Sequence, residues 1–203
     1  PGRGGRDNST WTLRTEHLAE RNRLVFIIAL GETVLITGGI LSDMELTAGV
    51  VTAATVGFGL LFSLWWNYFN PHVEPAENGT VSTEAGRSAY AYAHAAMVGG
   101  AIVVAVAIEK ITAHPFDPLD VKTTMVTFGG PAIYLAGNIW FLRSHTSRVP
   151  VDRLAAVGVL ALLATVMIVL RDSISPLAAL AAATAVFVAL AINSTRTGDL
   201  AVH

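Results

Sequence analysis

Six long apolar runs, separated by shorter polar connections, constrain this chain more than any other feature of its sequence. A helix needs about 20 mostly apolar residues to cross about 30 Å of hydrocarbon, because each residue adds about 1.5 Å. Six segments approach this length: residues 24–41, 46–69, 89–111, 123–142, 154–170 and 176–192. The sequence therefore predicts an all-α protein, a polytopic integral membrane bundle of about six transmembrane helices in a lipid bilayer.

The composition agrees with this class, since 53% of the 203 residues are apolar and 14% are charged. The charges cluster between the apolar runs, as expected when each charge must stay near water or inside a bundle. We expect residues 1–23 to form a polar N-terminal segment, residues 24–192 the membrane domain and residues 193–203 a tail. The connection at residues 70–88 contains two prolines and three glutamates, which predicts a water-exposed loop.

The distribution of Lys and Arg predicts the orientation of the chain in the membrane. Ten of these residues lie in the N-terminal segment and in the later segments on the same side, and Arg153 is one of them. The other side has only Lys110, Lys122 and Arg171. Because cytoplasmic loops retain positive charge, we expect a multi-pass protein of the cell membrane with both termini of this segment in the cytoplasm.

Several functional classes lack their usual signals. No stripe of Lys and Arg interleaved with aromatic residues is present, which argues against a nucleic-acid partner. The chain has no cysteine, no Walker loop, no dinucleotide fingerprint and no His-Glu-x-x-His pair, so we predict no cofactor and do not expect an enzyme. His17 and Glu20 have an i, i+3 spacing that metal ligands can use, but without a second pair they predict no metal site.

Glu32 is the most unusual residue of the first apolar run, because it lies near the middle of the predicted span. A charged carboxylate at that depth has to be paired, hydrated or neutralised by a proton. Arg21 falls within about 20° of Glu32 around the helix, and His17 lies about 60° away. Glu32 is therefore either a proton or cation site below a basic mouth, or a protonated carboxyl that hydrogen-bonds a neighbouring helix.

The third predicted span has a polar stripe at one end, formed by Arg87, Tyr90 and His94. An intramembrane histidine can relay protons, or it can be a neutral hydrogen-bonding residue of the core. At the other end of this span, Glu109 and Lys110 are expected to form an interfacial ion pair.

The fourth predicted span contains two glycines before Pro131, followed by Tyr134 and Asn138 one turn apart. A proline in a span frees a backbone carbonyl, so this pattern predicts either a broken helix that builds a midplane site or a simple kink. The glycines throughout the spans indicate close helix approach.

The run HLAERNRLVFIIALGET at residues 17–33 resembles the signature of the bacterial low temperature requirement protein A (LtrA) family. The run WWNYF at residues 65–69 is also similar to the family pattern, as is a Tyr-x-x-x-His pair before a small-residue helix that ends in Glu109. The resemblance implies that the family motif falls on His17, Glu20, Arg21, Gly31, Glu32, Tyr68, Tyr90 and His94. The chain has Asn70 where the family usually has an acidic residue.

Members of that family are longer than this chain and begin with a Glu-Leu-Phe-Phe-Asp type segment that is absent here. The resemblance therefore implies that the chain corresponds to the C-terminal half of a larger membrane protein, with the N-terminal half as a partner. It implies little about activity beyond a link to growth in the cold.

Two main hypotheses of function follow. In the first, the protein is a transporter or channel-like protein in which Glu32, His17, Arg21 and His94 handle a proton, a cation or a small solute. In the second, it is a non-transporting membrane factor that supports cold or stress tolerance, and the same residues hold the bundle together. A third, an intramembrane enzyme, would need another carboxylate or histidine beside Glu32. A hydrated cavity at Glu32 favours transport, and dry packing against Asn138 favours a structural role.

Overall fold

A computed structural model describes residues 9–69, 84–145 and 150–201, and within them the side chains of residues 20–69, 91–144 and 150–196. The described residues form helices and contain no β-strand. A short 3-10 turn at Arg171–Ser173 separates the last two helices. The helices in chain order are α1 (Ser9–Asp43), α2 (Ala48–Phe69), α3 (Glu84–Ala113), α4 (Val121–His145), α5 (Val151–Val169) and α6 (Pro176–Ala201).

Each of these helices has a segment long and apolar enough to cross a membrane, which gives six candidate spans. The prediction of an all-α polytopic bundle with about six spans is therefore confirmed. The helix ends differ from the predicted spans, most clearly in α1, which begins at Ser9 although the apolar run begins near residue 24. The polar residues before that run contain no proline or glycine between Ser9 and Leu30 to stop the helix.

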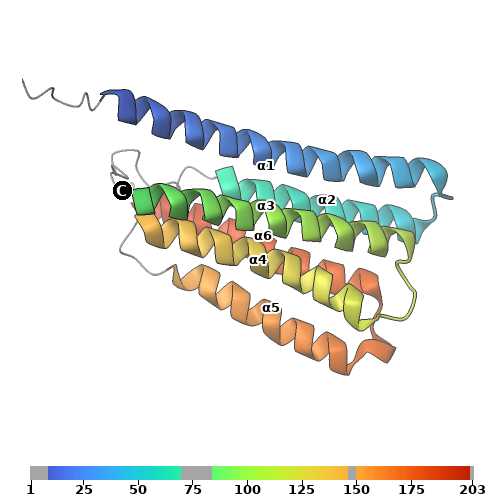
Figure 1. Ribbon diagram of the computed structural model, residues 1–203. Helices are drawn as coiled ribbons and strands as arrows, with labels where there is room; N and C mark the ends of the chain where they lie inside the picture. Colours follow the sequence, from blue (N-terminus) through green and yellow to red (C-terminus); the bar gives the residue numbers. More distant parts are fainter. Residues whose placement is uncertain (1–8, 70–83, 146–149, 202–203) are drawn as a thin grey trace, which may run out of the picture.

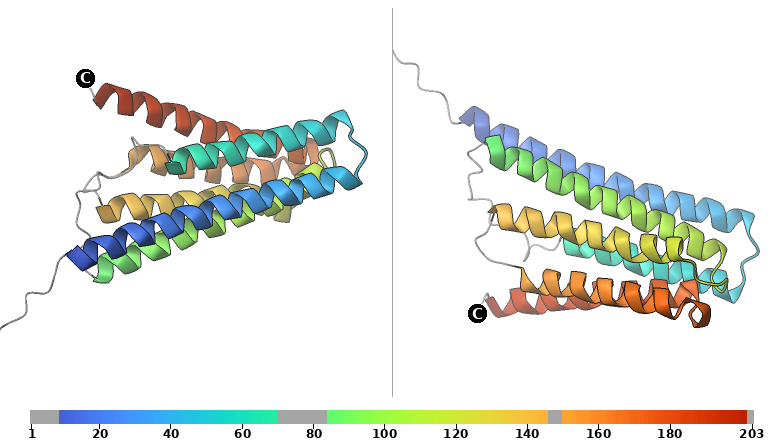
Figure 2. Two further views of the ribbon diagram at one scale, coloured as in Figure 1. Left: turned by 90° about the horizontal axis from the view of Figure 1, so that it is seen from above. Right: turned by 60° about the horizontal axis from the view of Figure 1, so that its bottom comes forward.

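Successive helices run antiparallel along the bundle, as expected when the connections between them are short (Figures 1 and 2). Helix α1 lies at one edge against α3 and α2, and α5 lies at the opposite edge against α4 and α6. The connections α1–α2, α3–α4 and α5–α6 share one end of the bundle. The opposite end holds the start of α1 and the end of the chain (Figure 1).

The closest helix packing is between α3 and α4, where glycine lets two backbones meet. A Cβ added to Gly100 would lie 2.5 Å from the backbone nitrogen of Tyr134 and 2.8 Å from the carbonyl oxygen of Gly130. The expectation that glycines permit close helix approach holds at these positions. Helix α4 continues through Pro131 without interruption, so no broken helix forms there.

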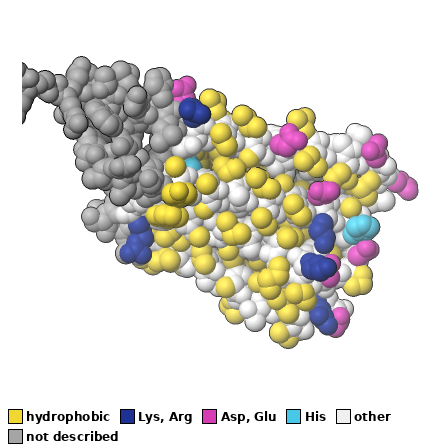
Figure 3. Space-filling view, viewed as in Figure 1, with side chains coloured by type: hydrophobic (Ala, Val, Ile, Leu, Met, Phe, Trp, Pro, Cys, Tyr) yellow, Lys and Arg dark blue, Asp and Glu magenta, His cyan; other side chains and the backbone are white. Residues whose placement is uncertain are grey.

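Much of the outer surface is apolar, as a bilayer requires. Large aliphatic side chains such as Leu35, Leu162 and Val169 are mostly exposed. Figure 3 shows hydrophobic side chains spread over one face of the bundle, with many of the charged side chains toward its two ends. A lipid environment is the natural surrounding of such a surface.

Candidate polar site at one end of the bundle

Arg153 is the charged residue that the bundle buries most clearly. It belongs to the first turn of α5, and only 5% of it is exposed. A basic side chain near the end of a membrane helix usually extends toward water. Here its Nε donates a hydrogen bond to Oδ1 of Asn138, and its Nη1 lies 2.8 Å from Oδ2 of Asp152. The guanidinium is thus directed into the bundle, with a carboxylate beside it that balances its charge.

Asn138 connects three helices at this level. It is buried in α4, and its side-chain oxygen accepts the hydrogen bond from Arg153 of α5. Its Nδ2 lies 3.8 Å from the sulfur of Met97 in α3, which is a weak acceptor. One turn earlier in α4, the buried hydroxyl of Tyr134 donates a 3.1 Å hydrogen bond to the carbonyl oxygen of Leu64 in α2.

His94 lies about one helical turn from Asn138 along the α3–α4 contact. Met97, which approaches Asn138, is one turn after His94, and Phe141, which contacts His94, is one turn after Asn138. His94 is buried, and its ring meets the ring of Phe141 edge-on at a centroid distance of 5.0 Å. It meets the ring of Tyr68 in the same manner at 5.8 Å. These contacts join the end of α2 to α3 and α4.

Aromatic rings close this region from the side of α1. Phe26 is fully buried and stacks on Tyr68 with a centroid distance of 4.1 Å, and it lies 5.9 Å from the ring of Tyr134. We use the name polar cluster for Tyr68, His94, Asn138, Asp152 and Arg153. The polar cluster therefore sits at the end of the bundle where α2 and α4 finish and α5 begins (Figure 1).

One nitrogen of the Arg153 guanidinium is not used. Nη2 of Arg153 is buried and has no hydrogen-bond partner in the part of the chain that the structure describes. A guanidinium has five N–H donors, and leaving a buried polar group unsatisfied costs about 1–3 kcal/mol, or more when it is charged. An oxygen acceptor at this place, from water or from a bound solute, would be stabilised.

The structure brings together three of the residues that the sequence singled out, Tyr68, His94 and Asn138. Sequence reasoning did not identify Arg153 as part of this group, because it counted the residue among the loop cations that set orientation. The available signal was an arginine directly before an apolar run and directly after an aspartate. That pattern does not show whether the side chain turns toward water or toward the bundle.

The other candidate residues are not brought into the polar cluster. Glu32, Arg21 and Glu20 all have exposed side chains on α1. The carboxyl of Glu32 therefore neither faces an internal cavity nor packs against Asn138. The side chains of His17 and Tyr90 lie outside those that the structure describes.

The predicted ion pair at the end of α3 is wrong. Nζ of Lys110 lies 3.9 Å from Oδ2 of Asp120, across the connection to α4. Glu109 is exposed and makes no ion pair within the described residues. Adjacent residues of a helix point in different directions, which explains why Lys110 pairs with a residue from the connection.

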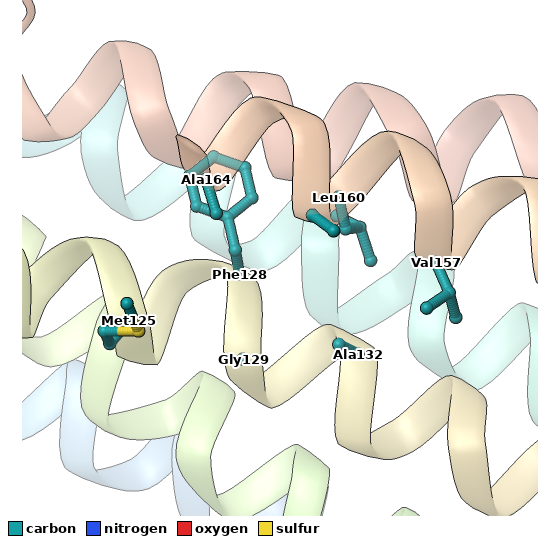
Figure 4. A pocket seen from close by; sticks show the side chains of 8 residues that line it. Met125, Phe128, Gly129, Ala132, Val157, Leu160 and Ala164 are labelled. Atoms are coloured by element: carbon teal, nitrogen blue, oxygen red, sulfur yellow. The ribbon is translucent and has the colours of Figure 1, made fainter. Parts of the chain in front are cut away.

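No group of three or more His, Asp or Glu residues that could hold a metal ion occurs among the described residues. A shallow cavity of about 170 Å³ does lie between α4 and α5 (Figure 4). It offers no side chain that could bind an ion, and its surroundings suit an apolar group. Its lining consists of Met125, Phe128, Gly129, Ala132, Val157, Leu160, Ala161 and Ala164.

Comparisons with known proteins give a family and one relative. A family model described as bacterial low temperature requirement A protein (LtrA) matches residues 1–192. The chain is 31% identical over 162 residues to an uncharacterised protein of Rhizobium meliloti (strain 1021). This match covers 77% of the chain and 39% of the relative, so the chain spans about two fifths of that protein's length. No solved structure matches the chain.

Proposed function

Since this chain belongs to the bacterial low temperature requirement A (LtrA) family and forms a multi-pass membrane bundle, we propose that it serves membrane transport of a small polar solute. In this proposal the polar cluster binds the solute, and Arg153 donates hydrogen bonds to an acceptor oxygen on it. The solute class is therefore a small molecule with a carboxylate, phosphate or similar oxygen group.

The observation that carries the proposal is the unsatisfied Nη2 of Arg153. Ionisable groups inside a membrane protein are costly, and they commonly mark the pathway of a substrate or an ion. Asp152 and Asn138 use two of the guanidinium nitrogens, which leaves the third available to a ligand. His94 and Tyr68 place further polar atoms in the same region.

Glu32 has a separate place in this proposal. Its carboxyl lies on the exposed side of α1 and does not contribute to the polar cluster. The expectation that Glu32, with Arg21, handles a proton or a cation stays a prediction about a second site. In such a site, Glu32 would bind and release a proton whose movement is coupled to transport of the solute.

The test is a binding and flux assay on the full-length protein in liposomes, with acetate, succinate, phosphate and sulfate as probes. At least one probe should raise the melting temperature, because ligand at a hundredfold excess over its dissociation constant stabilises the folded state by about 2.7 kcal/mol. The same probe should enter the liposomes. Arg153→Met should abolish both effects, whereas Arg143→Met, which changes an exposed arginine at the same end of the bundle, should keep them.

The alternative function is that of a non-transporting membrane factor, in which the polar cluster only holds helices together. The hydrogen bonds that join Asn138 to Arg153, and the packing of Asn138 on Met97, favour this reading. It predicts that no probe binds to the parent protein or to Arg153→Met or enters the liposomes with either, while Arg153→Met has a lower melting temperature than the parent. That combination would refute the transport proposal.

A further inference from the structure

The outward side of α1 carries a regular row of residues that the rest of the described chain leaves uncovered. Ile28, Gly31, Leu35, Gly38 and Ser42 follow one another at alternating steps of three and four residues, and all are exposed. We call these five residues the α1 seam. A Cβ added to either glycine would meet no atom within 4 Å.

The spacing of the α1 seam is the heptad pattern by which two helices pack side by side at a small crossing angle. Ile28 and Leu35 are 67% and 72% exposed, and the glycines between them would let another backbone approach closely. The opposite side of α1 is already used, since Phe26, Leu30 and Thr33 are buried against the bundle.

Glu32 lies directly beside the α1 seam, near the middle of the candidate span Glu20–Asp43. Its side chain is exposed and has no hydrogen-bond or ion-pair partner among the described residues. An acidic residue at the centre of a membrane helix costs about 2.5–3.5 kcal/mol on insertion scales. Hydrocarbon is therefore an unfavourable neighbour for this face, although the seam itself is mostly apolar.

A second copy of the chain would not remove this cost. Copies in one membrane have the same orientation, so their α1 helices would pack in parallel along the seam. In a parallel pair, Glu32 would be at the flanking position that faces Ile27 and Val34 of the other copy. Neither of these side chains can donate a hydrogen bond, so the carboxyl would stay unsatisfied.

We propose that the α1 seam packs against a further transmembrane helix from a part of the full-length protein outside this chain, with a hydrogen-bond donor level with Glu32. The length of the Rhizobium meliloti relative supports a helix from outside this chain, because the match covers only 39% of that protein. Most of that protein thus lies outside the matched region. The inference does not depend on the proposed transport function, because it concerns α1 and not the polar cluster.

The test places a photo-reactive amino acid at Leu35 of the full-length protein, which also carries protease sites directly before Pro1 and directly after His203. After irradiation in membranes and cleavage at both sites, we expect the fragment that contains Leu35 to stay covalently joined to another fragment of the same protein. The control places the same amino acid at Leu162, which is 64% exposed on the outward side of α5 and should give severalfold less joined product. A product of two whole copies, an adduct with lipid alone, or equal yields at both positions would overturn the proposal.

The donor is tested by two substitutions in the Leu35-labelled protein. Glu32→Gln keeps a group that can hydrogen-bond, so it should leave the yield of joined fragments close to that of the parent. Glu32→Leu removes the group and should lower the yield by about threefold or more, since hydrogen bonds to charged groups are among the stronger ones. An unchanged yield in Glu32→Leu would show that the helix next to the seam offers no donor to Glu32.

Discussion

Replacing Gly100 by alanine should separate α3 from α4, although it adds only one methyl group. The new Cβ would lie 2.5 Å from the backbone nitrogen of Tyr134 and 2.8 Å from the carbonyl oxygen of Gly130. Backbone atoms of a packed helix cannot turn aside as the tip of a flexible side chain can. The two helices would therefore have to move apart by about 0.9 Å to restore an ordinary contact of 3.4 Å.

The size of the effect follows from this displacement. A gap of about 0.5–1 Å loses a quarter to a half of the attraction between packed atoms, and overpacking of a core costs about 1–3 kcal/mol. Gly99 is the matched control, because a Cβ added there would meet nothing within 4 Å. Both substitutions share the gain in helix propensity of about 1 kcal/mol, so the difference between them isolates the clash.

The assay is thermal unfolding of both variants in the same detergent or nanodisc. For a protein of this size, 1 kcal/mol corresponds to about 2–4 °C, so we expect Gly100→Ala to melt about 5 °C below Gly99→Ala. Gly100→Ala should melt below Gly99→Ala in detergent and in lipid nanodiscs alike. If the two variants melt within 1 °C of each other (about 0.3–0.5 kcal/mol on the same scale), the close approach of α3 and α4 at Gly100 is wrong.

Two further predictions concern single hydrogen-bonding groups. Asp120 caps α4, because its Oδ1 accepts a 2.6 Å hydrogen bond from the amide nitrogen of Thr123, and this hydrogen bond lowers the pKa of the carboxyl. Loss of the cap in Asp120→Ala should cost about 1 kcal/mol of unfolding free energy. Because the pKa of Asp120 is lowered in the folded state, the parent should be more stable than Asp120→Ala above about pH 4, and this difference should fade as the pH falls through the folded pKa. Melting curves across that range measure the difference, and a difference independent of pH would contradict the prediction. Tyr134→Phe removes the 3.1 Å hydrogen bond to the carbonyl of Leu64 and should lower stability by about 1 kcal/mol in the same assay, whereas no change would mean that the bond is not formed.

The number and type of elements could be predicted from the sequence because the bilayer sets them physically. A helix that crosses hydrocarbon needs a fixed length of apolar residues, and this requirement is visible as hydropathy. The start of α1 at Ser9 has no such signal, since a helix that continues from the membrane into water changes its composition but not its backbone geometry. The glycines of the spans predicted close helix packing in general, but the sequence did not show that Gly100 packs against α4.

The direction in which a membrane helix faces was much harder to predict. In a water-soluble helix, polar residues mark the outside, but a transmembrane helix is apolar toward both lipid and protein. The grouping of Arg21 and Glu32 on one side of α1 was predicted from helix geometry, and both are exposed. The sequence could not show that this side turns away from His94. It also gave no sign that Arg153 turns toward Asn138.

The two edges of the bundle differ in how well their outward sides suit lipid. Both edge helices are little buried, with 17% of the α1 span and 22% of the α5 span inside the bundle, against 50% for α4. The ionisable residues of the α5 span, Asp152 and Arg153, lie in its first turn and pair with each other, so its outward side can face lipid without cost. The outward side of α1 has a carboxyl at mid-depth and two uncovered glycines. Any further helix should therefore join at α1, and a truncated protein that lacks it should gain stability from Glu32→Leu, because that change removes an uncompensated polar group from the lipid face.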